Sequence, residues 1–177
     1  MWRQLETLHT GDLSADAFEQ WVYSAPDLET VLGRDLALEF LAFDYRGRGE
    51  SQELHALVER AYAERRPGEL VYDMARRVAE EFLAGERDLW RTTGPLASLF
   101  ARGHDWVPVI LVGIDSELDS IPAPHVRASW EPDALTRLLA ESEAIVASYE
   151  STVRDALESM LQMLDARSAN SEPPTPM

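Results

Sequence analysis

The chain contains no cysteine and, although it carries 16 basic residues, no lysine, so every basic side chain is an arginine. Without cysteine there is no disulfide framework, no thiol nucleophile and no thiolate ligand for zinc. Without lysine there is no phosphate-binding P-loop, because the lysine of that motif contacts the phosphates. These two absences exclude several common scaffolds and enzyme classes.

Positive charge is also scarce, since 32 acidic residues oppose the 16 arginines and the formal net charge is -16. A nucleic-acid-binding protein needs a basic surface that neutralises phosphates, so we expect no nucleic-acid partner. Long apolar runs are missing as well. The longest, 106–114, is too short to cross a bilayer, and the N-terminus lacks the apolar stretch of a signal peptide. We therefore expect a cytoplasmic protein that contacts no membrane.

The remaining composition is that of an ordinary globular protein, with 45% hydrophobic and 27% charged residues in a chain of 177. Apolar residues recur at threes and fours through the first hundred residues and predict a series of short helices. Gly11, Pro26, Gly33 and Pro67 separate these helices. Residues 36–43 fit either a helix or a strand, and a helix is favoured because no neighbouring segment offers a ladder partner.

The C-terminal part predicts one long helix, or two placed end to end. Proline at position 132 and acids beside it mark the start, and neither glycine nor proline interrupts the apolar repeat from Asp133 to Arg167. The apolar stripe follows threes and fours rather than a strict heptad, which favours packing within the chain's own domain over dimerisation. Residues 168–177 contain three prolines and are expected to form a disordered tail.

The pattern changes between these parts. Val107–Ile114 is continuously apolar and rich in β-branched residues, which is typical of a buried strand. A lone strand leaves its backbone unsatisfied, and His125–Trp130 offers the best partner. The predicted fold is therefore mainly α (α+β). A single helical domain covers 1–167, with a small antiparallel β-ribbon near 107–130 and a long C-terminal helix.

Three carboxylates alternate in the loop expected after this strand, at Asp115, Glu117 and Asp119. They resemble the first ligands of a calcium loop, but Ser120 and Val126 stand where an EF-hand requires glycine and glutamate. We therefore predict no metal here. The loop is interpreted either as an acidic contact surface for a basic partner or as an ordinary solvated loop.

The candidate partner-contact residues are those acids, further acids of the long helix, and a pair before the glycine-arginine turn at 46–49. They are Asp115, Glu117, Asp119, Glu141, Glu143, Glu150, Asp44 and Tyr45. For Tyr45, the alternative to a binding role is a buried tyrosine that is hydrogen-bonded to a neighbour.

Signatures of enzymes are absent from the sequence. The four histidines form no i,i+4 metal pair, and there is neither a nucleophile elbow nor a dinucleotide-binding glycine motif. We therefore predict no catalytic residue and no cofactor. The enzyme alternative is a small metal-dependent hydrolase that uses the loop 115–119 together with His104 or His125.

Four segments carry a resemblance to a known group of proteins: Phe18–Tyr23, Phe43–Tyr45, Val112–Glu117 and Trp130–Pro132. Together they resemble small acidic bacterial proteins of unassigned function, some of which resemble immunity proteins of polymorphic toxin systems. The resemblance covers most of the chain before the tail and transfers no catalytic residue. It implies a protein that neutralises a cognate toxin by binding and occluding it.

An immunity protein of this kind would meet a basic toxin through an acidic patch, which raises the association rate and fixes the register. A helical adaptor that dimerises through the long C-terminal helix is the remaining alternative. The sequence leaves the identity of the partner and the oligomeric state open.

Overall fold

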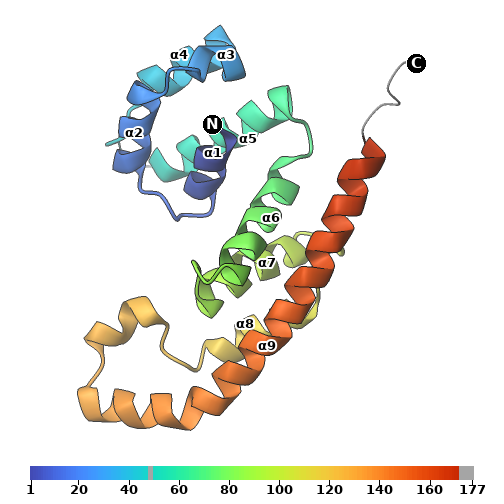
Figure 1. The fold of residues 1–177 in the computed structure, drawn as a ribbon. Helices are drawn as coiled ribbons and strands as arrows, with labels where there is room; N and C mark the ends of the chain where they lie inside the picture. The colour runs from blue at the N-terminus through green and yellow to red at the C-terminus, as the bar shows by residue number, and fades with distance from the viewer. Residues whose placement is uncertain (48–49, 172–177) are drawn as a thin grey trace. The chain divides into compact units, whose positions relative to one another are not determined.

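The computed structural model describes residues 1–47 and 50–171, and within these ranges it is built from helices without any strand (Figure 1). Short connections, many of which contain glycine or proline, separate the elements. In chain order these are α1 (Trp2–His9), α2 (Ala15–Ser24), α3 (Leu28–Leu32), α4 (Arg34–Ala42), α5 (Glu50–Arg65), α6 (Leu70–Leu83), α7 (Leu89–Ala101), α8 (Ile110–Leu118), the 3₁₀-helix η1 (Pro124–Ser129) and α9 (Pro132–Ser171).

The mainly helical fold and the long C-terminal helix are confirmed, whereas the β-ribbon near 107–130 is wrong. Its first strand is replaced by a turn and α8, and its second by η1. From the apolar run to the end of α8 the buried positions are Val107, Leu111, Ile114 and Leu118, which follow the helical period, while Val109 is 65% exposed. A helix satisfies its backbone without a partner strand, so the β-branched composition did not decide the structure.

The chain divides into two compact units, Met1–Arg77 and Val78–Met177, and the division falls within α6. That residues 1–167 fold as a single domain stays a prediction. α9 continues to Ser171, past the start of the predicted tail, and residues 172–177 lie outside the described part of the chain.

Unit 1 has an aromatic and aliphatic core. Phe18 of α2, Phe40 of α4 and Tyr45 are buried with ring centroids about 6 Å apart, at 5.9 Å for the two phenylalanines and 6.2 Å for Phe18 and Tyr45. Ser14 accepts a hydrogen bond from the backbone N–H of Ala17 (3.3 Å) and begins α2, as the sequence predicts.

A buried polar network joins α1, α5 and the first part of α6 in unit 1. The Tyr62 hydroxyl donates to Oε1 of Glu6 (2.8 Å), and the Arg77 guanidinium lies 3.7 Å from the other oxygen of Glu6. Asp73 forms an ion pair with Arg66. Burial raises the pKa of Glu6 above its ordinary value, although Tyr62 and Arg77 act in the opposite direction. Burial likewise raises the pKa of Asp73, against the effect of Arg66.

Unit 2 is organised around the pair α7 and α8, and α9 packs against α8. Thr93 of α7 is fully buried and donates to Oδ1 of Asp115 on α8 (3.0 Å). A Cβ on Gly94 would lie 3.5 Å from the same carboxylate oxygen, at ordinary van der Waals distance. The hydrogen bond therefore fixes the register of α8 against α7.

The two halves of α9 differ in burial. In the second half Val153, Leu157, Met160 and Leu164 are buried at helical spacing. In the first half the same apolar stripe continues, but its residues are half-buried or, at Ile145, 47% exposed. The amphipathic face of the first half is thus incompletely covered.

α9 also changes direction in its N-terminal, orange part (Figure 1). Ser142 lies in this part, and its hydroxyl donates to the Leu138 carbonyl one turn earlier (2.7 Å). Such side-chain bonds to the i−4 carbonyl bend helices. None of the helices in the described ranges combines the length and the apolar character needed to cross a membrane.

Candidate functional site

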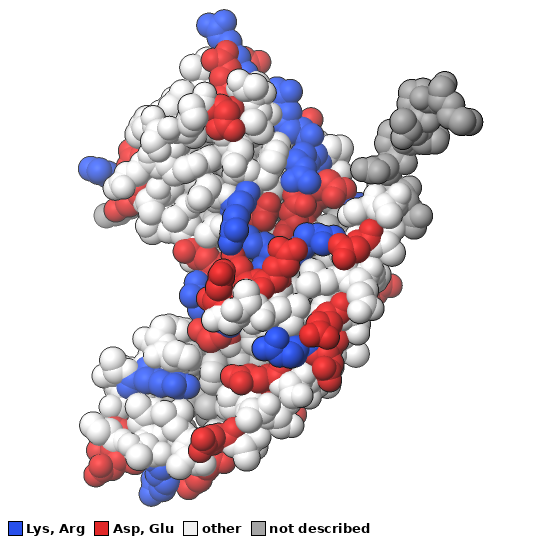
Figure 2. Space-filling model, in the orientation of Figure 1, with Lys and Arg blue, Asp and Glu red and all other residues white. Residues whose placement is uncertain are grey.

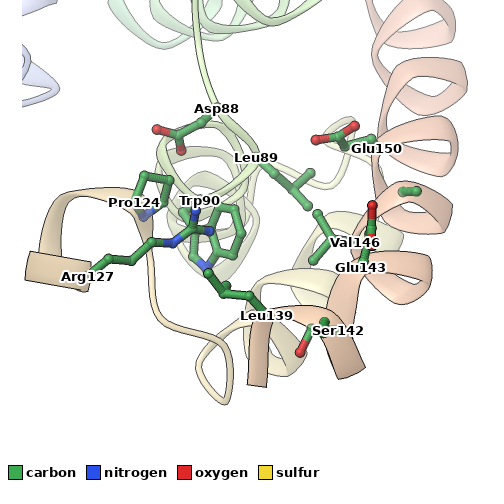
Figure 3. Close-up of a pocket in the computed structure, with 12 residues that line it drawn as sticks. Asp88, Leu89, Trp90, Pro124, Arg127, Leu139, Ser142, Glu143, Val146 and Glu150 are labelled. Atoms are coloured by element: carbon green, nitrogen blue, oxygen red, sulfur yellow. The ribbon is translucent and has the colours of Figure 1, made fainter. Parts of the chain in front are cut away.

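The candidate site is a cavity of about 570 Å³ in unit 2. This volume lies within the range of roughly 300–1,000 Å³ that is typical of ligand sites. Its walls come from the start of α7, from η1 and from the first half of α9 (Figure 3). The lining residues are Asp88, Leu89, Trp90, Pro124, Arg127, Leu139, Ala140, Ser142, Glu143, Val146, Ala147 and Glu150.

Trp90 and Arg127 are held in place by contacts with the backbone and with each other. The Trp90 indole N–H donates to the carbonyl of Ile121 (3.1 Å), and Nε of Arg127 donates to the carbonyl of Pro122 (3.1 Å). The Arg127 guanidinium lies 5.5 Å from the centroid of the Trp90 ring, within the range of a cation–π contact. The two side chains therefore tie η1 to the start of α7.

The α9 wall follows directly from helical spacing. Glu143, Val146, Ala147 and Glu150 stand at i, i+3, i+4 and i+7, so they form one stripe along the helix. Apolar side chains thus occupy the middle of this wall, with one carboxylate above and one below.

Some of the charged groups that line the cavity have hydrogen-bond partners and others have none. Asp88 caps α7, because its carboxylate accepts from the backbone N–H of Arg91 (2.9 Å). In the described part of the chain neither Glu143 nor Glu150 makes a side-chain hydrogen bond or ion pair, and no carboxylate pairs with Arg127. The cavity therefore presents both signs of charge without internal neutralisation.

Carboxylates are common on the surface around α9. Figure 2 shows them along this helix with a few arginines between them. The site thus lies in a region with an excess of negative charge.

Of the eight residues predicted to contact a partner, Glu143 and Glu150 lie together at the cavity. Glu141 is also exposed on α9, but two positions from Glu143 a helix has turned by about 200°, so Glu141 points elsewhere.

Asp115, Glu117 and Asp119 were expected to share one loop, but α8 replaces this loop and directs the three side chains to different surroundings. Asp115 is half-buried and holds α8 against α7. Glu117 is exposed and accepts a hydrogen bond from Tyr149, and Asp119 is exposed at the end of α8. In the described residues no group of three or more histidine, aspartate and glutamate side chains is arranged to hold a metal ion.

Asp44 and Tyr45 lie in unit 1. Asp44 is exposed, accepts from the backbone N–H of Arg46 (3.2 Å) and lines a separate cavity of about 840 Å³. Tyr45 is 2% exposed and donates to the Phe40 carbonyl (2.8 Å), which is the buried-tyrosine alternative. Burial raises its pKa well above the ordinary value.

The sequence did not single out Trp90 or Arg127. Trp90 follows a helix cap, and Arg127 was placed in a strand, so nothing in the pattern connected them. Comparisons with known proteins give no further guidance: no family model, no curated protein and no solved structure matches the chain.

Proposed function

We propose that this chain is a protein-binding protein and that the cavity of unit 2 receives a basic segment of its partner. The observation that supports the proposal is an apolar cavity wall flanked, one above and one below, by the unpaired carboxylates of Glu143 and Glu150. An incoming arginine or lysine side chain has an apolar stem and a charged end, and this arrangement offers a complement to both.

The two kinds of contact have different roles in this proposal. The negative charge around the cavity raises the rate of encounter with a basic partner. Burial of Trp90 and Val146 against the partner slows dissociation, because desolvated apolar and aromatic contacts at the centre of an interface carry most of its energy. The apolar wall therefore mainly sets the dissociation rate and the glutamates the association rate, and the affinity depends on both.

The biological setting that we propose is toxin immunity in the cytoplasm. A toxin whose active site is basic, such as a nuclease that binds phosphates, offers the complementary charge. Occupation of that active site by the rim of the cavity would exclude the substrate. This part of the proposal rests on the resemblance of the four segments named above and requires no cofactor in this chain.

The test is capture of the partner by tagged variants. Wild-type protein is compared with Glu143→Lys/Glu150→Lys and with Asp155→Lys/Glu158→Lys, which changes the net charge equally at exposed positions of α9 outside the cavity. We expect wild type and the second variant to retain the same basic protein and the cavity variant to lose it. The captured protein is then purified and its toxicity measured with and without co-expression of this chain.

Stopped-flow association of the purified pair separates the cavity from overall charge. The cavity variant should associate more slowly than the matched variant at low salt, and the difference should shrink at high salt. Equal capture and equal association rates for the two variants would exclude the cavity as the docking site. Unrelieved toxicity in co-expression would exclude immunity while leaving protein binding intact.

A further inference from the structure

Arg127 is a cation within a cavity that otherwise carries carboxylates. Its guanidinium lies over Trp90, and Nε donates to the Pro122 carbonyl. The guanidinium has further N–H donors beyond Nε. Across the described chain no carboxylate pairs with these donors, so they remain available to a ligand.

The opposite charges enter the cavity from opposite sides. Figure 3 shows Arg127 extending from η1 toward Trp90, whereas Glu143 and Glu150 come from α9 on the other side. A simple anion that approaches Arg127 is repelled by the surrounding carboxylates, and a simple cation at the glutamates is repelled by the fixed guanidinium. A ligand that carries both charges meets neither penalty.

We propose that the cavity selects a partner segment that presents an anionic and a cationic group together with apolar side chains. A carboxylate binds the guanidinium of Arg127, and an ammonium or guanidinium group binds Glu143 or Glu150. This inference rests on the proposed function, because it specifies what the basic segment of the partner must also contain. Arg127 is thus the residue that sets specificity, since it rejects segments whose charge is only positive.

Three ring compounds of similar size test the proposal with the whole chain: benzoate, benzylamine and para-aminomethylbenzoate, which carries both charges. Binding is followed through the indole N–H signal of Trp90 in proton–nitrogen NMR spectra, assigned by its loss in Trp90→Phe. In the wild type we expect para-aminomethylbenzoate to bind about tenfold more tightly than either compound with one charge.

Variants show which residues recognise the carboxylate of the compound and which recognise its ammonium group. Arg127→Met keeps an unbranched apolar side chain but removes the charge, so para-aminomethylbenzoate should bind no better than benzylamine. Glu143→Gln/Glu150→Gln should reduce it to the level of benzoate. Arg137→Met, an exposed arginine of α9 outside the cavity, serves as the matched control and should leave the tenfold preference unchanged.

Arg127→Lys distinguishes loss of the charge from a structural defect of the variant, because it keeps the positive charge while changing the shape of the group. We expect it to keep part of the preference that Arg127→Met loses. Equal binding of benzylamine and para-aminomethylbenzoate to wild type, no binding of any compound, or an unchanged preference in Arg127→Met would each overturn the proposal. The proposed function fails separately, if capture of the partner does not depend on Glu143 and Glu150.

Discussion

Glu6 illustrates at the scale of a single residue how burial and charge compete in unit 1. The residue is 6% exposed and has Tyr62 and Arg77 beside its carboxyl group, yet the net effect of the surroundings is a pKa above the ordinary 4.5. The folded protein therefore holds this proton more tightly than the unfolded chain does. The resulting contribution to stability is complete below the unfolded pKa and is lost as the pH rises through the folded pKa.

Glu6→Gln removes this titration and keeps an acceptor for the Tyr62 hydroxyl. Wild type loses the contribution of Glu6 as the pH rises, whereas the variant does not. We therefore expect the free energy of unfolding of the variant to increase relative to that of wild type as the pH rises from about 4 to about 7. Urea denaturation across this pH range measures the difference. A constant difference between Glu6→Gln and wild type across this pH range would contradict the assignment.

At the scale of the helix, α8 is where composition and structure disagree, and Gly113 provides the sharpest test. Gly113 lies inside this helix, and a Cβ added to it meets no atom within 4 Å. Alanine loses less backbone entropy than glycine on entering a helix, so Gly113→Ala should raise the free energy of unfolding by about 0.5–1 kcal/mol.

Gly103 is the contrasting position, because its φ of +93 favours glycine over every other residue. Gly103→Ala should therefore destabilise the protein by roughly 1 kcal/mol or more. Chemical denaturation of both variants gives the comparison. Destabilisation by both substitutions to the same extent would argue against a helix at 110–118.

Most helices followed from the sequence because their apolar residues recur at the helical period and their ends carry recognisable residues. Ser14 before α2 and Pro67 after α5 are examples. The run at 107–114 failed because β-branched residues favour strands only where a partner supplies hydrogen bonds. The sequence predicts Glu141, Glu143 and Glu150 together on the long helix, and the structure brings Glu143 and Glu150 to the cavity. Trp90 and Arg127 come from separate elements, and only the tertiary structure brings them together.

At the scale of the whole molecule, the excess of acidic residues has a cost for stability. With a net charge of -16 the folded chain concentrates repulsion that the expanded unfolded chain relieves. Added salt screens this repulsion, so the thermal midpoint should rise between about 20 mM and about 300 mM sodium chloride. Differential scanning calorimetry at the two concentrations measures the shift.

Asp155→Lys/Glu158→Lys should show a smaller rise with salt, because its net charge is closer to zero. A midpoint that falls with salt would show that favourable ion pairs outweigh the overall repulsion. The measurement therefore decides whether the acidic composition stabilises or destabilises the fold at low ionic strength.

η1 forms one wall of the cavity, yet none of its six residues is buried. Arg127 holds it through the Pro122 carbonyl and the face of Trp90, outside the core of α7 and α8. Such a segment opens at a small fraction of the free energy needed to unfold the whole unit. η1 can therefore move to fit a bound ligand while α7 and α8 stay folded. The free energy of this local opening is separate from the free energy of unfolding of the helical core.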